Sequence, residues 1–230
     1  MLKKITSYFT KTEILIWTVS VIFITVSFAV FDRESYLTLI ASLIGVTSLI
    51  FNAKGNPIGQ VLMVIFSIIY GIISFSFSYY GEMITYLGMT LPMAVFALIS
   101  WLRNPYKGKH SEVKVNRISK KEIVFMAILA ALVTAVFYVI LKYLNTANLF
   151  FSTASVTTSF IAAYLTFRRS PYFALVYASN DIVLIILWIL ATITDISYLS
   201  VVICFIVFLV NDLYGFINWK KMQKNQNKCQ

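Results

Sequence analysis

The chain has 230 residues, of which 60% are hydrophobic and only 12% are charged, whereas soluble globular chains are about 45–50% apolar and about 25% charged. A water-soluble core of this length could not bury so much apolar surface, so the composition excludes an ordinary soluble protein. The formal net charge of +10 does not indicate nucleic-acid binding, because the basic residues are divided among short segments between apolar runs and do not gather on one face.

Eight apolar runs are long enough, or nearly so, to cross about 30 Å of hydrocarbon as helices. We expect transmembrane helices at residues 14–31, 36–51, 58–80, 83–102, 123–141, 147–167, 172–193 and 196–219. The second run is short, and a hairpin that does not cross the membrane is the competing assignment. The first run could be a signal peptide, but no small-x-small cleavage pattern precedes Asp32 and the run is long, so we expect the helix to be retained.

The loop charges support eight spans with both termini in the cytoplasm, because cytoplasmic loops near spans collect Lys and Arg. Of the nineteen basic residues, only Arg33 and Lys142 then lie outside. No seven-span alternative keeps the short loops so one-sided. The sequence therefore predicts a multi-pass protein of the inner, cytoplasmic membrane.

The cysteine and histidine residues do not suggest a metal or redox centre. Cys204 falls inside the last apolar run and Cys229 in the basic tail, so neither has an evident oxidising partner. The one histidine, His110, has no second His or Cys at ligand spacing. We predict no metal site and no cofactor.

Two stretches of the sequence recur in its second half. Residues 52–57 are similar to residues 166–171 at an offset of 114, and residues 96–101 to residues 214–219 at an offset of 118. A net insertion of four residues reconciles the offsets, so we interpret spans two to four and six to eight as related three-helix units. Chance similarity between membrane helices is the alternative.

The predicted topology makes these units parallel repeats. Spans two and six both run from outside to inside, so the fifth span must return the chain before the second unit begins. We therefore divide the chain into an extra N-terminal helix (1–34), a first repeat (35–104), a basic cytoplasmic loop with a linker helix (105–145), a second repeat (146–220) and a basic cytoplasmic tail (221–230). Parallel repeats are a transporter architecture, with the substrate site near the midplane between them.

Two carboxylates mark the predicted site. Asp181 in the seventh span and Asp212 in the eighth are the only charges inside any run, and each follows an asparagine, Asn180 or Asn211. A carboxylate at a helix centre costs about 2.5–3.5 kcal/mol on insertion scales, so we expect both to face the bundle interior. Each pair lies about 12–14 Å from the predicted cytoplasmic end. Two polar pairs at matched depth predict one polar centre.

Helical periodicity adds aromatic and amide side chains to this centre. Tyr177 and Trp188 share the face of the acidic pair in the seventh span, where we place Trp188 near the membrane centre, and Tyr214 and Asn218 lie beside the pair in the eighth. Such a set suits a flat cationic heterocycle with hydroxyl groups. The alternative is that these polar groups hold helices together and that Trp219 is an interfacial anchor.

The first repeat lacks carboxylates at the matching positions, so its contribution must come from other residues. The candidates are Gln60, Ser67, Tyr70, Ser74 and Tyr79. We expect Gln60 and Tyr70 to reach the substrate, although Gln60 could equally be a gate or a loop residue. The serines could instead bond to carbonyls of their own helices.

Residues 169–181, Trp188 and residues 211–219 resemble the PnuC nicotinamide riboside transporters of bacteria. The resemblance covers about residues 36–219, and the run Asn-Asp-Leu-Tyr-Gly-Phe-Ile-Asn-Trp is its most specific part. It implies an all-α integral membrane protein of eight helices, an extra N-terminal helix followed by a three-plus-one-plus-three parallel repeat similar to the SWEET sugar transporters. It also implies facilitated diffusion of a vitamin precursor used for NAD, and it is compatible with a homotrimer.

The chain contains no Gly-x-x-x-x-Gly-Lys loop, so ATP cannot drive uptake directly, and accumulation would require a cytoplasmic kinase that traps the product. Some relatives carry thiamine or riboflavin, and the sequence does not separate these substrates. A proton-coupled transporter, in which Asp181 or Asp212 changes protonation, is another hypothesis. A membrane enzyme with the two carboxylates as acid and base is disfavoured, because the spans hold no histidine and no second cysteine.

The topology makes a direct labelling prediction. Single cysteines introduced at Lys109 and Arg168 should react with membrane-impermeant reagents only from inside, and cysteines at Glu82 and Asp195 only from outside. Any one of the four on the other side would contradict the eight-span arrangement.

Overall fold

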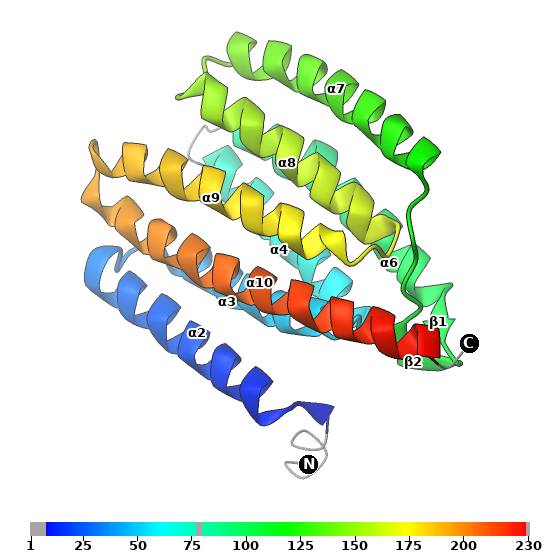
Figure 1. Ribbon diagram of the computed structural model, residues 1–230. Helices are drawn as coiled ribbons and strands as arrows, with labels where there is room; N and C mark the ends of the chain where they lie inside the picture. The colour runs from blue at the N-terminus through cyan, green and yellow to red at the C-terminus, as the bar shows by residue number, and fades with distance from the viewer. Residues whose placement is uncertain (1–7, 77–79, 229–230) are drawn as a thin grey trace.

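The computed structural model describes residues 8–76 and 80–228. Within these residues, eight helical segments are long and apolar enough to cross a membrane, which confirms the predicted all-α membrane fold. The segments are α2 (Lys11–Phe31), α3 (Tyr36–Ala53), α4 (Ile58–Ser76), α5 to α6 (Tyr80–Leu102), α7 (Lys120–Tyr143), α8 (Leu149–Phe167), α9 (Tyr172–Thr192) and α10 (Leu199–Lys228). Figure 1 shows the start of α2 and the end of α10 at one end of the bundle, here called the terminal end, and we call the opposite end the distal end.

The fourth span is not the regular helix that the sequence predicted. It begins at Tyr80, earlier than expected, and consists of α5 (Tyr80–Ile84), a π-helical segment η1 (Thr85–Thr90) and α6 (Leu91–Leu102). Pro92 is the second residue of α6, and a proline has no N–H for the helical ladder. The hydroxyl of Thr90 donates to the carbonyl of Thr85 at 3.2 Å. A π segment widens the helix and often marks a functional site.

The last helix extends beyond the predicted span. A short 3₁₀ turn, η2 (Ile196–Tyr198), precedes α10, which continues as far as Lys228. The buried amide of Gln226 explains this extension, because it donates to Oε1 of Glu112 at 2.9 Å and accepts from the backbone N–H of Val115 at 2.8 Å. The described part of the segment that we expected as a basic tail is therefore the end of an anchored helix.

The basic loop between α6 and α7 forms a small antiparallel hairpin of β1 (Pro105–Tyr106) and β2 (Lys109–Val113). Lys107 and Gly108 make the turn with positive φ angles of 48° and 74°. The side chain of Val113 is 1% exposed, and its N–H donates to the carbonyl of Gly55 at 3.0 Å. The hairpin thus packs against the turn between α3 and α4 at the terminal end.

Two tryptophans at the terminal end join the two halves of the bundle. The first half contains the expected repeat 35–104 and the second half the expected repeat 146–220. The indole N–H of Trp101, at the end of α6, donates to the carbonyl of Thr166 in α8 at 2.8 Å. The indole N–H of Trp219 in α10 donates to the carbonyl of Asn52 in α3 at 2.7 Å. Both rings are fully buried, and their centroids are 5.4 Å apart. Each bond joins the third helix of one expected repeat to the first helix of the other.

The neighbouring residues repeat this pattern. The hydroxyl of Ser100 donates to the carbonyl of Phe167 at 2.8 Å, and the amide of Asn218 donates to the carbonyl of Ala53 at 2.7 Å. These bonds have the offsets of 118 and 114 residues found in the sequence. We call the four bonds from Ser100, Trp101, Asn218 and Trp219 the crossed latch. It gives side-chain donors to the carbonyls in the last turns of α3 and α8. Those of Ala53 and Phe167 accept from Asn218 and Ser100, whereas those of Asn52 and Thr166 also accept from the backbone N–H groups of Gly55 and Arg169.

The first and fifth membrane helices also correspond. Thr10 caps α2 and Ser119 caps α7, each by accepting the N–H of a glutamate three residues later. These glutamates, Glu13 and Glu122, form ion pairs with Lys54 after α3 and Arg168 after α8, respectively. Figure 1 shows α2 and α7 at opposite edges of the bundle. Both helices are therefore attached to the first helix of their own half in the same way.

The crossed latch leads to a stability prediction. Trp101→Phe or Trp219→Phe keeps an aromatic ring but removes one buried hydrogen bond between the halves, which costs about 0.5–1.5 kcal/mol. Each variant should unfold at a lower temperature in detergent, as followed by circular dichroism. Trp188→Phe is the matched control, because the indole N–H of Trp188 has no hydrogen-bond partner among the described residues. Equal melting temperatures for all three variants would contradict the latch.

Candidate functional site

An elongated pocket lies between the two halves of the bundle. Its lining comes from α3 and α4 on one side, α8, α9 and α10 on the other, and the α5–η1–α6 helix between them. Glu82, Thr146 and Ser152 line it at the distal end, whereas Asn52 and Gln60 line it toward the terminal end. The pocket therefore follows the membrane normal through most of the span, and the crossed latch lies at its terminal end.

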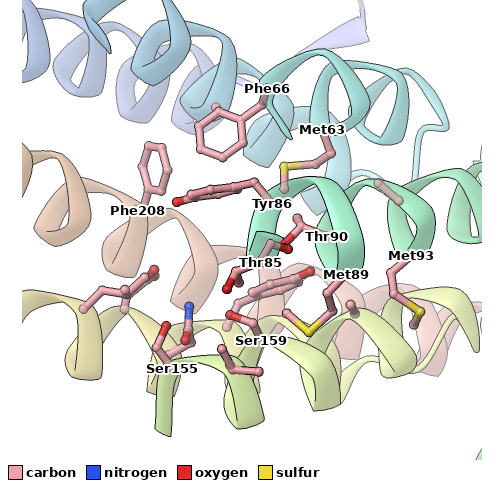
Figure 2. Close-up of a pocket in the computed structure, with 18 of the residues that line it drawn as sticks. Met63, Phe66, Thr85, Tyr86, Met89, Thr90, Met93, Ser155, Ser159 and Phe208 are labelled. Carbon is pink, nitrogen blue, oxygen red and sulfur yellow. The ribbon is translucent and has the colours of Figure 1, made fainter. Parts of the chain in front are cut away.

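Aromatic rings from three helices form one wall of the pocket. Phe66 of α4 and Phe208 of α10 lie near Tyr86 of η1 (Figure 2), with the Phe66 centroid 6.2 Å from Tyr86 and 6.4 Å from Phe208. Gly45 makes room for these rings, because a Cβ there would lie 2.6 Å from Cζ of Phe208. Ser155 and Ser159 of α8 and Thr85 of η1 supply hydroxyl groups to the pocket. Flat apolar faces and hydroxyl groups thus line one space.

Asp181 and Asp212 meet in this pocket. They are 4% and 5% exposed, and their carboxyl groups are close enough to interact electrostatically. Oδ2 of Asp181 is buried without any hydrogen-bond partner in the described residues. Two adjacent carboxyl groups in an apolar interior require a proton or a cation between them. The arrangement is suited to hold a positively charged group.

The seventh span contributes three further predicted residues to the lining, Tyr177, Asn180 and Trp188. Oδ1 of Asn180 accepts a hydrogen bond from the hydroxyl of Thr158 at 2.7 Å, which fixes the amide against α8. The ring of Trp188 packs on Tyr198 with a centroid distance of 5.3 Å. Trp188 lies only four residues before the end of α9, so its expected place at the membrane centre is wrong. It belongs to the distal part of the pocket.

Gln60 of the first repeat also lines the pocket, and a polar chain holds it in place. Its amide donates to Oδ1 of Asn52 at 2.8 Å, and the amide of Asn52 is 3.2 Å from the hydroxyl of Ser48. Gly59 allows this close packing, because a Cβ there would lie 2.2 Å from the Asn52 side chain. Asn52 also lines the pocket, although the sequence predicted only that it belongs to a recurring stretch.

Three of the predicted residues in α10 point away from the pocket. Asn211 donates to the hydroxyl of Ser20 at 2.9 Å, Tyr214 donates to Glu13 at 3.2 Å, and Asn218 belongs to the crossed latch. Successive residues of a helix are rotated by about 100°, so Asn211 cannot face the pocket together with Asp212. These side chains bind α2 and α3 to α10.

The remaining candidates in the first repeat lie behind or beside the aromatic wall. Tyr70 is 8% exposed and lies between Phe66 and Tyr86, with centroid distances of 4.6 and 5.1 Å. Ser67 donates to the carbonyl of Met63 in its own helix at 2.8 Å. Ser74 is buried, and Tyr79 lies outside the described residues. None of the three described residues is among the residues that line the pocket.

The sequence did not predict the polar residues that α5, η1, α8 and the connection before α8 bring to the pocket. These residues are Glu82, Thr85, Tyr86, Thr90, Thr146, Ser152, Ser155, Ser159 and Thr166. A signal was present in α8, where Ser152, Ser155 and Ser159 recur at spacings of three and four residues and therefore share one helix face. The π segment, in contrast, rotates the side chains that follow it to directions that a regular period of 3.6 residues does not predict.

A sequence profile of the family described as "Nicotinamide mononucleotide transporter" matches residues 35–221. The chain belongs to this family. Two relatives in the family are both named "Nicotinamide riboside transporter PnuC". The one from Neisseria mucosa is 24% identical over 86% of this chain and 77% of its own length. The one from Haemophilus influenzae is 23% identical over 84% of this chain and 83% of its own length.

A solved structure shares the fold. It is described as "Crystal structure of the Vitamin B3 transporter PnuC", with a TM-score of 0.80 and 24% identity, and the match covers 95% of this chain and 94% of that one. The family assignment and this fold confirm the resemblance noted in the sequence. The protein is therefore a multi-pass membrane transporter of the PnuC family.

Proposed function

We propose that the chain carries nicotinamide riboside across the cytoplasmic membrane by facilitated diffusion. The observation that carries the proposal is the buried pair Asp181 and Asp212, one of whose oxygens has no partner, inside a pocket with aromatic walls. Two relatives are named for this substrate. Nicotinamide riboside is a flat pyridinium cation joined to a ribose, so it offers one positive charge, one aromatic face and several hydroxyl groups.

Each part of such a substrate has matching groups in the pocket. A pyridinium ring is attracted by carboxylates and by the faces of aromatic rings. The ribose hydroxyls find acceptors and donors in the amides of Asn180 and Gln60 and in the hydroxyls of α8. Because a membrane interior makes an isolated carboxylate costly, a bound cation would stabilise the acidic pair and be stabilised by it.

The crossed latch suggests how access is controlled. It holds the third helix of each proposed repeat against the first helix of the other at the terminal end. Release of these four bonds would let the repeats 35–104 and 146–220 separate at that end. We place the termini and the latch on the cytoplasmic side on the basis of loop charge, so the latch is the proposed inner gate.

The proposed transport needs no energy source. A facilitator equilibrates its substrate, and accumulation then follows from a cytoplasmic kinase that phosphorylates the product. The second candidate is proton-coupled transport, which the partnerless oxygen of Asp181 favours because it could accept a proton. Thiamine is also a cationic heterocycle with a hydroxyl group, whereas riboflavin carries no positive charge. The acidic pair favours the cations.

Uptake into proteoliposomes tests the substrate and the energetics together. Labelled nicotinamide riboside should equilibrate without exceeding the outside concentration, and thiamine and riboflavin should enter more slowly. Concentration above the outside level under an imposed proton gradient would show proton coupling in place of facilitated diffusion. Faster entry of thiamine or riboflavin would overturn the substrate assignment.

The acidic pair should be needed for affinity. Asp181→Asn and Asp212→Asn retain shape but remove charge, and hydrogen bonds to charged groups contribute about 1.5–3 kcal/mol. Each variant should therefore raise the half-saturating nicotinamide riboside concentration about tenfold or more, at normal expression and normal melting temperature. Asn211→Ala is the comparison, because its side chain contacts α2: it should lower stability more than affinity. Unchanged affinity in both aspartate variants would refute cation binding at this pair.

Trp188 should contribute through its ring. Trp188→Ala should weaken binding by about 1–2 kcal/mol, roughly 5- to 30-fold, and Trp188→Phe by less because a smaller aromatic face remains. Binding can be measured by titration calorimetry of the purified protein. Trp188→Leu separates the two roles: if leucine restores the affinity that alanine loses, side-chain volume is what matters and stacking is excluded.

A further inference from the structure

Resting on the proposed function, we infer that Glu82 forms a second cation site at the distal end of the pocket, where a positively charged substrate binds before it reaches the acidic pair. Glu82 lines the pocket, whereas the loop charges predicted only that it lies on the outer side of the membrane. Its ligand class is an organic cation whose charge is spread over a flat ring.

The position of Glu82 is determined by close packing at the start of α5. Gly81 is buried, and a Cβ there would lie 2.5 Å from Oγ1 of Thr146 and 2.9 Å from Cδ2 of Leu141. The helix therefore begins directly against the connection between α7 and α8. Leu141, Thr146 and Glu82 all line the pocket at this level. The carboxylate is thus part of the pocket wall and not of a loop in water.

No protein group satisfies this carboxylate. In the described residues the ion pairs are those of Glu13 with Lys54 and Glu122 with Arg168, and Glu82 takes part in neither. Within the described residues, the side chain of Glu82 also makes no hydrogen bond. The described lining contains no Lys, Arg or His. A structural role would require a partner, so the carboxylate is available to a ligand.

The distal carboxylate and the acidic pair are separate along the pocket. Glu82 is two residues from the start of its helix, whereas Asp181 is nine residues from the opposite end of α9. At 1.5 Å per residue their levels differ by about 15 Å. Trp188 lies near the level of Glu82, so an aromatic face is close to the distal carboxylate in depth. Successive sites of moderate strength allow a cation to enter and also to leave.

A pair of charged thiol reagents tests the electrostatics without any substrate. Thr85→Cys places a thiol one helical turn from Glu82, on the pocket wall, in a background where Cys204→Ala and Cys229→Ser remove the native thiols. The probes are the trimethylammonium and sulfonate forms of ethyl methanethiosulfonate at mildly alkaline pH. The ratio of cationic to anionic labelling rates should fall about tenfold when Glu82→Gln is added.

Glu34→Gln is the matched control. Glu34 is an exposed carboxylate at the distal end, in the connection between α2 and α3 and outside the pocket lining. Its removal changes the net charge by the same amount, so it should leave the labelling ratio within about twofold. Equal effects of Glu34→Gln and Glu82→Gln, or no effect of either, would overturn the distal site.

Transport of two redox forms of one substrate tests the use of the site. Nicotinamide riboside is a cation, and its dihydro form has nearly the same shape without the charge. Glu82→Gln should raise the half-saturating concentration about three- to tenfold for the cation, with little change for the dihydro form, and Glu82→Asp should restore part of the difference. Equal losses for both forms would show that Glu82 shapes the pocket without recognising charge, and would refute the inference.

The two tests separate this inference from the proposed function. If the wild-type protein transports neither form, the substrate assignment fails, while the thiol ratio still reports whether Glu82 attracts cations. If transport is normal but the ratio does not depend on Glu82, the distal site is wrong and the substrate assignment stands.

Discussion

The structure depends on hydrogen bonds that close helix ends in an environment with little water. The last carbonyls of α3 and α8 lack partners in their own helices, and side chains from the opposite half of the bundle satisfy them, Asn218 for one and Ser100 for the other. Trp219 and Trp101 add a second hydrogen bond to the preceding carbonyls. Because the same bonds cap helices and join halves, the two halves cannot separate at this end without exposing buried carbonyls. The elongated pocket lies between the two halves, and these bonds lie at its terminal end.

The pocket itself shows an asymmetric division of labour between the halves. The second half supplies the acidic pair, Asn180 and the hydroxyl face of α8, whereas the first half supplies Gln60, the distal carboxylate and the rings of Phe66 and Tyr86. The hydrogen bonds at the helix ends thus recur in both halves, whereas the side chains that line the pocket differ. Similar helix ends therefore hold two different sets of side chains around one space.

The sequence predicted eight spans and the meeting of Asp181 with Asp212, because apolar length and the cost of a buried charge are strong constraints. It failed where facing within a helix mattered. Asn211 was grouped with Asp212 although a rotation of about 100° sends it to α2, and the π turn before Pro92 redirected residues that a regular period would misplace. Glu82 was missed because a charge near a span end reads as a loop residue, and only the packing around Gly81 draws it into the pocket.

The matching caps and ion pairs of α2 and α7 bear on the origin of the architecture. Thr10, Glu13 and Lys54 correspond to Ser119, Glu122 and Arg168, so the same contacts attach α2 to α3 and α7 to α8. This correspondence favours a repeating unit of four helices. A unit with an even number of crossings returns the chain to the side on which it began. Tandem duplication of such a unit yields two copies with the same orientation directly, with no need to recruit a separate helix to turn the second copy around.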